Sequence, residues 1–349
     1  MTSNLDPLSA PDAPAGPGAP PASARQPAAD PPPPDGPVVV LAGGTGGARL
    51  ARGMLDVVER PEQLVVIANT GDDIEIYGGH VSPDPDLITF WLADRIDERG
   101  WGLGGDTFAV MDGLRELGHD VWFNLGDRDL AIALDRARAL AAGRTLTAAQ
   151  AAIVTALGVR ARVLPMSEEP VRTRIDAGGR WWPLQEFMIR RRGEGPIDGV
   201  EYRHAPAATP TPEVVTALAH ARAIVIGPSN PVISIGPILA VPGVAEAIRA
   251  SPAPVVAVSP LVGGAVLKGP TAACLEWSGR TLDSDGIVAS YGSLIDGLVA
   301  DERAREVPTL EHDMLLDTPA RRREVADATL RFALGLTGAR RGSTTGASG

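Results

Sequence analysis

The chain has 349 residues, enough for one large or two ordinary domains, and 44% of them are hydrophobic, which is ample for a sizeable core. Its net charge of −11 argues against a nucleic-acid partner, because there is no excess of cations to displace the counterions of a phosphate backbone. No apolar run reaches the roughly 18 residues of a membrane span, and no charged-then-apolar leader opens the chain, so we expect no membrane partner. The single cysteine, Cys274, fits a reducing compartment, and we expect a cytoplasmic protein.

The two ends of the chain differ in composition from the rest. Residues 1–36 are mostly Pro, Ala, Asp, Gly and Ser, and such a segment cannot bury enough surface to offset its ordering entropy. We predict disordered tails at 1–36 and 339–349, on either side of a folded region at 37–338. Within that region, about 160–205 breaks the rhythm of the other elements, and we interpret it as an inserted subdomain of mixed structure.

Short apolar runs alternate with helical stretches through the folded region. The predicted strands are 38–42, 64–69, 121–125, 223–227 and 254–259. The predicted helices are 48–58, 86–98, 106–118, 129–142, 147–157, 212–220, 243–250 and 318–335. This alternation is typical of βαβ units, so we predict an α/β fold with a doubly wound, mostly parallel sheet.

The first predicted strand runs straight into a glycine-rich turn, Gly43-Gly44-Thr45-Gly46-Gly47. Glycine allows a sharp turn and leaves no Cβ between the backbone N–H groups and an approaching anion. The start of the helix that follows, with its free N–H groups and positive dipole end, favours a phosphate. We interpret the turn as a site for a nucleotide or a diphosphate, and a purely structural glycine turn is the alternative.

Small, polar and acidic residues follow every predicted strand. Ligands of an open α/β sheet sit beyond the carboxyl ends of its strands, so we expect these loops to meet at one edge. Several of their carboxylates suit Mg²⁺, a hard cation that takes one or two carboxylates plus phosphate oxygens. For Asp84 and Asp129, a role at a helix N-terminus is the alternative. The candidate carboxylates are Asp72, Asp73, Asp84, Asp86, Asp127 and Asp129.

With these residues in view, the chain resembles the CofD/FbiA family, transferases of coenzyme F-420 biosynthesis. The resemblance spans about 38–338, and its most specific part is a Gly-Pro-Ser-Asn-Pro block that continues as Ser-Ile-Gly-Pro. The similar segments, in chain order, are 42–46, 69–73, 82–86, 125–129, 164–167, 227–239 and 259–263.

The resemblance implies a Rossmann-like domain with a smaller added subdomain, acting on small-molecule substrates. The implied reaction moves 2-phospholactate or phosphoenolpyruvate from a guanosine-diphosphate-activated donor to the deazaflavin Fo. It forms coenzyme F-420-0, or its dehydro form, and GMP, with Mg²⁺ as cofactor.

The resemblance also assigns roles to individual residues. It places Asp86 and Asn124 against Fo, with Asp86 as the catalytic residue that orients the Fo hydroxyl or takes its proton. It implies that the nucleotide diphosphate is held by Gly43, Gly44, Thr45, Gly46, Ser229 and Asn230. Among the candidate carboxylates named above, we assign Asp72, Asp73 and Asp84 to the metal.

Two other functions remain as alternatives. An NAD-dependent oxidoreductase needs a third glycine where Arg49 stands and an acidic residue about 20 positions past the turn, whereas Asp72 lies 28 residues beyond Gly44. A non-catalytic nucleotide-binding regulator of the same superfamily would keep the turn without the transfer. The sequence also leaves open which of the two donors is used and whether the chain forms a homodimer.

Overall fold

A computed structural model of the chain describes the backbone of residues 32–344 and the side chains of residues 32–336. Most of the predicted tail at 1–36, and part of that at 339–349, lies outside these residues. The centre of the fold is a sheet of seven strands in the order β14-β13-β10-β9-β1-β2-β5. Every neighbouring pair in it is parallel. Its strands are β1 (Val38–Ala42), β2 (Leu64–Ala68), β5 (Arg162–Pro165), β9 (Ala223–Ile226), β10 (Val255–Val258), β13 (Gly297–Ala300) and β14 (Thr309–Glu311).

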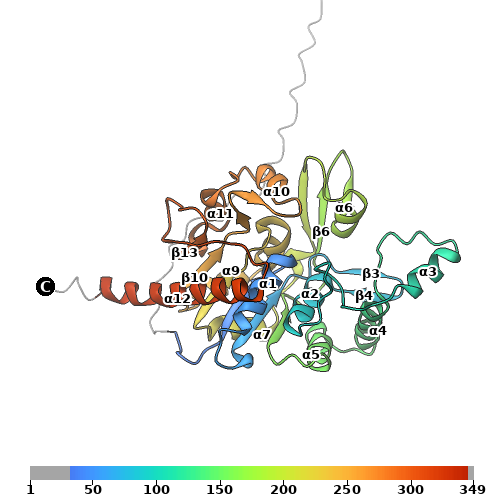
Figure 1. Ribbon diagram of the computed structural model, residues 1–349, viewed down its shortest axis with the longest axis horizontal. Helices are drawn as coiled ribbons and strands as arrows, with labels where there is room; N and C mark the ends of the chain where they lie inside the picture. The colour runs from blue at the N-terminus through green and yellow to red at the C-terminus, as the bar shows by residue number, and fades with distance from the viewer. Residues whose placement is uncertain (1–31, 345–349) are drawn as a thin grey trace, which may run out of the picture.

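Helices cover both faces of this sheet, which confirms the predicted Rossmann-like α/β fold (Figure 1). Alternate residues of β1 pack on the two faces of the sheet, because successive side chains of a strand point to opposite sides. Val39 and Leu41 pack in one core with α7 (Pro212–Ala219), α8 (Gly236–Ala240), α9 (Val244–Ala250), α10 (Thr271–Trp277) and α11 (Ser284–Tyr291). Val38 and Val40 pack in the other with α1 (Gly44–Leu55), α2 (Pro83–Leu92), α5 (Leu146–Ala156) and α12 (Pro319–Thr344).

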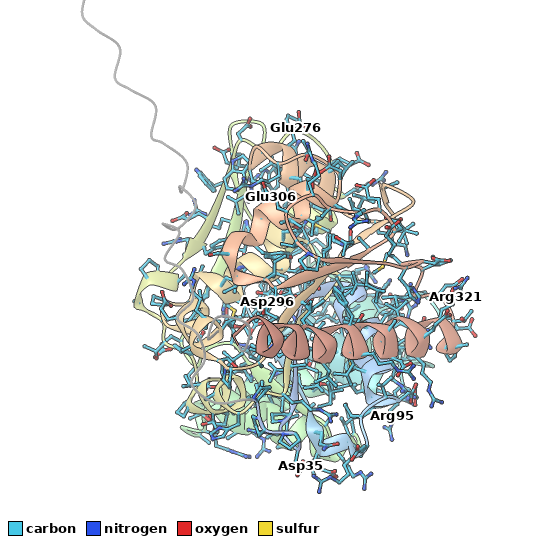
Figure 2. The ribbon with its side chains drawn as sticks, turned by 90° about the vertical axis from the view of Figure 1, so that its left-hand side faces the viewer. Asp35, Arg95, Glu276, Asp296, Glu306 and Arg321 are labelled. Atoms are coloured by element: carbon cyan, nitrogen blue, oxygen red, sulfur yellow. The ribbon has the colours of Figure 1, made fainter. Side chains whose placement is uncertain are left out.

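Helix α12 lies along the outside of this second core. Figure 2 looks onto it from the side, with the labelled Arg321 near its first turn. All the predicted helices are present, and α12 runs further than the predicted 318–335. Short single-turn helices join the longer elements; they are η1 (Pro61–Gln63), η2 (Ala205–Ala207), η3 (Pro231–Ile235) and η4 (Gly292–Leu294).

The strand predicted at 121–125 is wrong. This segment is irregular chain between α3 (Ala109–Glu116) and α4 (Asp127–Ala141). Its apolar side chains Val121, Phe123 and Leu125 belong to a small cluster around α3, α4 and the hairpin β3 (Ile74–Ile76)–β4 (Gly79–Val81). A short apolar run indicates that a segment is buried, but it does not indicate whether that segment is a strand of the sheet or irregular chain in another cluster.

Two smaller units flank the sheet. One is the α3–α4 lobe just described, and the other is an antiparallel sheet in the order β7-β6-β8. The latter comprises β6 (Arg172–Asp176), β7 (Trp181–Pro183) and β8 (Gly199–Arg203), with helix α6 (Leu184–Arg190) packed on it. It occupies most of the stretch 160–205, but β5 within that stretch is the edge of the main sheet. A two-stranded hairpin, β11 (Leu261–Val262) and β12 (Ala265–Val266), follows β10.

No single helix in the described part of the chain is long and apolar enough to cross a membrane. The helical segments Pro231–Ala240 and Val244–Ala250 are long and apolar enough only when taken together, and the chain bends by 83° between them. Ile238, Val244 and Ile248 of this pair are fully buried in the first core. Its apolar character is therefore accounted for by packing within the protein.

The order of the sheet reverses at β1. The chain goes from β1 to β2 and β5 on one side, then returns to β9 on the other side of β1. At such a switch point the loops after the two central strands part and leave a crevice beyond their carboxyl ends. The glycine turn after β1 and the loop 227–231 after β9 both lie at this crevice.

Candidate active site

The glycine turn is held by side chains from two other loops. Gly44 begins α1 and has φ of +64°, a conformation that glycine adopts without strain. The Gly43 N–H donates to Oγ of Ser229 at 3.3 Å, and the Gly44 N–H donates to Oδ1 of Asp84 at 2.6 Å. A carboxylate of the protein thus already lies at the helix N-terminus, where the dipole favours negative charge.

Gly46 faces away from the crevice. A Cβ at this position would overlap the backbone carbonyl oxygen of Pro228 in the loop after β9. The absence of a side chain at Gly46 is therefore explained by the close approach of two backbones. Gly44 and Thr45, in contrast, line a cavity at the edge of the sheet.

Asp84 lies between the N-termini of α1 and α2. Its second oxygen, Oδ2, accepts from the side-chain amide of Asn69 at 2.9 Å, and Asn69 in turn accepts from the Gly71 N–H at 2.7 Å. Burial raises the pKa of Asp84 to about 6, although the hydrogen bonds from Asn69 and Gly44 oppose the rise. This carboxylate is held in a fixed orientation at the cavity wall.

Asp72 and Asp73 point in different directions. Asp72 lines the cavity, and its Oδ2 accepts from the Gln185 amide of α6 at 2.9 Å. Its Oδ1 is buried and has no hydrogen-bond partner among the described residues. Asp73 lies outside the cavity lining, where it accepts from the Ser82 hydroxyl at 2.7 Å and faces the His80 ring at 3.0 Å.

The cavity carboxylates suit a shared cation. Burial raises the pKa of Asp72, and the charges of Asp84 and Asp73 raise it further, so these groups destabilise one another when ionised. Within residues 32–336, no group of three or more His, Cys, Asp or Glu side chains is arranged to hold a metal by itself. Because Mg²⁺ binds through one or two carboxylates plus substrate phosphates, Asp72 and Asp84 with a bound diphosphate fit such an ion.

Asp86 is the buried partner of an arginine. Both of its oxygens face Nη1 and Nη2 of Arg136, a residue of α4 that is 0% exposed. Arg136 also donates to the His80 carbonyl at 2.9 Å and to Gln150 at 3.1 Å. Burial raises the pKa of Asp86, and Arg136 opposes the rise. This pair anchors the α3–α4 lobe to the first turn of α2 at the cavity wall.

Asn124 lines the cavity, whereas Ser229 and Asn230 support it from the loop after β9. Asn124 also accepts from Nη2 of Arg115 at 2.6 Å. Asn230 caps η3, because its side-chain oxygen accepts from the N–H groups of Val232 and Ile233 at 2.8 and 3.1 Å. Ser229 accepts from the Gly43 N–H, as described above. The loop after β9 therefore supports the glycine turn.

The wall opposite the glycine turn is aromatic and apolar. The cavity has a volume of about 600 Å³. Trp122 and Phe123 stack with their ring centroids 5.6 Å apart. The apolar and aromatic lining comes from α2, the α3–α4 lobe and α6, and comprises Phe90, Trp101, Trp122, Phe123, Leu184, Met188 and Ile189. One cavity thus has acidic side chains beside the glycine turn and an apolar, aromatic part, which we call the aromatic slot. This combination suits a two-substrate reaction.

The model of one family, 2-phospho-L-lactate transferase CofD, matches residues 38–329. This range includes every residue of the site described above. The chain belongs to the CofD family, and it is a transferase.

Named relatives of this CofD protein cover most of its length. A phosphoenolpyruvate transferase of Thermobifida fusca is 37% identical over 86% of this chain and 98% of its own length. One of Kitasatospora aureofaciens is 40% identical over 76% of this chain and 84% of its own. A 2-phospho-L-lactate transferase of Methanosarcina mazei is 36% identical over 77% of this chain and 88% of its own length. Among solved structures, a UPF0052 family protein of Bacillus halodurans matches with a TM-score of 0.56 and 19% identity, over 84% of this chain and 99% of its own, which supports the fold alone.

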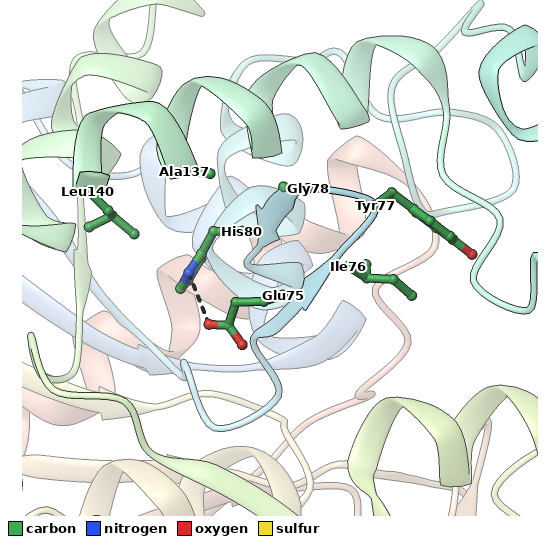
Figure 3. Close-up of a pocket in the computed structure, with 8 residues that line it drawn as sticks. Glu75, Ile76, Tyr77, Gly78, His80, Ala137 and Leu140 are labelled. Atoms are coloured by element: carbon green, nitrogen blue, oxygen red, sulfur yellow. Dashed lines mark ion pairs between the residues drawn. The ribbon is translucent and has the colours of Figure 1, made fainter. Parts of the chain in front are cut away.

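A second cavity of this CofD protein, of about 400 Å³, lies beside the β3–β4 hairpin (Figure 3). His80 extends from β4 toward Glu75, 3.3 Å away, and its other ring nitrogen faces Asp73. Burial disfavours the charged ring, but the hydrogen bonds with Asp73 and Glu75 raise the pKa of His80 to about 9. Arg172 adds a contact to Glu75 at 2.7 Å. The cluster ties the hairpin to the loop after β2.

Sequence reasoning missed several residues that build the site. Arg136 and Gln185 lie on helices outside the similar segments, and no pattern distinguishes them from exposed polar residues. The aromatic pair Trp122-Phe123 directly precedes Asn124, and in a chain with 4% aromatic residues this is a signal that was available. The acidic loop 124–129 reaches the cavity from the start of α4 rather than from a strand end.

Proposed function

We propose that this chain transfers a 2-phospholactate or phosphoenolpyruvate moiety from its guanosine-diphosphate-activated donor to the deazaflavin Fo. The products are coenzyme F-420-0, or its dehydro form, and GMP, and the reaction depends on Mg²⁺. The observation that carries the proposal is the single cavity with a phosphate-compatible end and an aromatic slot. The names of the relatives, 2-phospho-L-lactate transferase and phosphoenolpyruvate transferase, support the transferred group.

The activated donor occupies the end of the cavity at the sheet edge. Gly44 and Thr45 line this end of the cavity at the first turn of α1. The Gly44 N–H already donates to Asp84, so we assign the diphosphate to the other N–H groups of that turn, which have no partner within the helix. Ser229 and Asn230 contribute by fixing the backbone of the neighbouring loops. Asp72 and Asp84 would hold Mg²⁺ against the phosphate oxygens; when bound, this ion supplies positive charge that stabilises the departing phosphate. Asp73 supports the site indirectly, because it accepts a hydrogen bond from Ser82, the residue that precedes α2.

The acceptor occupies the apolar end. The rings of Phe90, Trp101 and Trp122 give a flat deazaflavin system surfaces on which to stack. Asn124 and the Asp86–Arg136 pair offer polar groups for the ribityl chain of Fo. Because both oxygens of Asp86 already face Arg136, we assign Asp86 the orientation of the attacking hydroxyl.

The chemical step is a displacement at phosphorus. The terminal ribityl hydroxyl of Fo attacks the phosphorus that bears the three-carbon acid, and the bond to the GMP oxygen breaks. In phosphoryl transfer the protein forms few or no covalent bonds to the substrates. Positioning and charge neutralisation therefore supply most of the acceleration. The rigid acidic end and the aromatic slot would provide the positioning, by holding the two substrates in line.

The test uses the purified full-length chain with Fo and each guanylylated donor in turn. We expect Mg²⁺-dependent formation of the F-420-0 product and GMP, followed by mass spectrometry, with one donor strongly preferred. Quenching of Fo fluorescence and calorimetry with GDP measure binding on the same preparation. Binding of both ligands without product from either donor would contradict transfer and favour a nucleotide-binding regulator.

A further inference from the structure

The two aspartates at the start of α4 have separate environments. Asp127 accepts from the N–H groups of Ala109 and Val110 at 3.1 and 3.0 Å, so its side chain holds the first turn of α3. The N-terminus of α4 is satisfied by Asp106, which accepts from the N–H groups of Arg128 and Asp129. The side chain of Asp129 is therefore not needed as a hydrogen-bonding cap of α4.

Asp129 instead lines the cavity. Its Oδ1 is buried and, within the described part of the chain, has no hydrogen-bond partner. The backbone N–H of Leu103 lies near the same carboxylate and lowers its pKa. A buried carboxylate oxygen without a partner is costly, because burial removes its hydrogen bonds to water. Its position at the cavity wall indicates that a ligand supplies the missing hydrogen-bond donor.

Asp86 is a poor recipient for a proton by comparison. Its two oxygens face the two terminal nitrogens of Arg136, and that guanidinium is fully buried. A proton placed on either oxygen would break a charge-assisted hydrogen bond and leave a buried arginine without its counter-charge. Oδ1 of Asp129 has no such contact, so protonating it disrupts nothing in the structure.

We propose that Asp129 is the general base that takes the proton of the attacking hydroxyl, an inference that rests on the proposed transfer to Fo. The Fo hydroxyl oxygen forms a bond to phosphorus while its proton passes to Oδ1 of Asp129. The bond from phosphorus to the GMP oxygen breaks, and its electron pair remains on GMP. Asp129 then releases the proton to solvent.

The electrostatic surroundings of Asp129 suit this role. Burial and, to a smaller extent, the charges of Asp86 from α2 and of Asp106 together raise the pKa of its carboxyl to about 7, although the Leu103 N–H and Arg99 oppose the rise. A general base is most effective when its pKa lies near the working pH. Near neutral pH, a substantial share of the Asp129 side chains is therefore ionised and able to accept a proton.

The test compares Asp129→Asn and Asp129→Glu with a matched control, Asp135→Asn. Asp135 lies on the same helix, is exposed and pairs with Arg138 on the surface. For D129N we expect kcat to fall by about 10²- to 10⁴-fold, with Fo and GDP affinities within about threefold of wild type. The acidic limb of the kcat/KM profile near pH 7 should disappear in D129N. It should persist in D129E, at a reduced rate, and the profile of D135N should match that of the wild type.

Each result bears on a different claim. If D129N keeps wild-type kcat and the acidic limb, Asp129 is not the base, although the proposed transfer stands. If D129N loses Fo or GDP binding in proportion to its activity while its thermal melting is unchanged, Asp129 is a binding residue and the base assignment is overturned. If the wild-type chain itself makes no product with either donor, the proposed function fails, and the base assignment fails with it.

Discussion

Replacing Arg136 with methionine removes one half of a buried ion pair and keeps most of the apolar volume of the side chain. Arg136 is 0% exposed and donates to Asp86, to Gln150 and to the carbonyl of His80. Breaking a buried pair in this way costs about 3–5 kcal/mol, because the remaining carboxylate is left uncompensated. That is a large part of the roughly 5–15 kcal/mol that stabilises a typical folded protein.

The assay is urea unfolding with thermal melting on the same preparations. At roughly 2 °C per kcal/mol for a chain of this size, we expect the melting temperature of R136M to fall by about 6–10 °C. The deficit should shrink from pH 8 to pH 5, because the unpaired Asp86 can take up a proton at the lower pH. The control is Arg138→Met on the same helix, whose side chain is 80% exposed and pairs only with surface Asp135; it should change stability by less than about 0.5 kcal/mol.

A double-mutant cycle separates the ion pair from packing. Asp86→Asn alone leaves Arg136 buried without its counter-charge, so it should also destabilise the fold, in addition to its effect on Fo turnover. The double variant should lose less stability than the sum of the two single variants, by at least about 1 kcal/mol. Single variants that match the R138M control, or strictly additive losses, would refute the reasoning that this pair joins α4 to α2.

Three other outcomes follow from the site. Gly46→Val should lower the melting temperature as well as abolish activity, because its side chain would overlap the carbonyl of Pro228; normal melting with normal activity would contradict this packing. Exhaustive EDTA treatment should abolish turnover and weaken GDP binding by at least about tenfold, with both restored by Mg²⁺, because Asp72 and Asp84 then repel the diphosphate without a counter-charge; full turnover in EDTA would exclude a metal role. Asp129→Asn should be more stable than wild type above pH 7. The folded pKa of Asp129, about 7, exceeds the ordinary value of 3.8 for an aspartate, so the wild type loses stability as the pH rises from about 4 to about 7, by at most about 4 kcal/mol. Equal urea midpoints for the two proteins at pH 8 would argue against an ionised, buried Asp129.

The sequence predicts the centre of the fold well, for a physical reason. β1 and β2 are buried along their whole length, so each is a continuous apolar run, and the glycines that follow β1 are required by backbone geometry. The prediction does not include β5, β13 and β14. β5 and β14 are the edge strands of the sheet, are short and include Arg162, Pro165 and Glu311. β13 is an interior, fully buried strand, but its apolar run is only four residues long and begins with Gly297. A long apolar run therefore identifies a central strand such as β1 or β2, whereas a short or partly polar strand gives too little signal.

The site was predictable as a set of loops but not as a set of contacts. Asp72, Asp84, Asp86 and Asn124 do line one cavity, as their places in the chain indicate. No local pattern shows that Asp86 faces a buried arginine fifty residues away, or that the Asn230 side chain turns back onto its own loop. Such pairings depend on how α4 packs on α2, which is a property of the tertiary structure alone.

The two ends of the cavity are built on different cores, and this bears on how the site can diverge. The sheet edge, with Gly44 and Asp84, depends on the two large cores, so nearly every substitution there affects the whole fold. The aromatic slot is carried by the small clusters of the α3–α4 lobe and of α6. A change at Asn124 or Trp101 alters the acceptor's surroundings while the sheet is left intact. If the acceptor binds in the aromatic slot as proposed, acceptor preference can change among descendants of such a chain while the proposed phosphate site is retained.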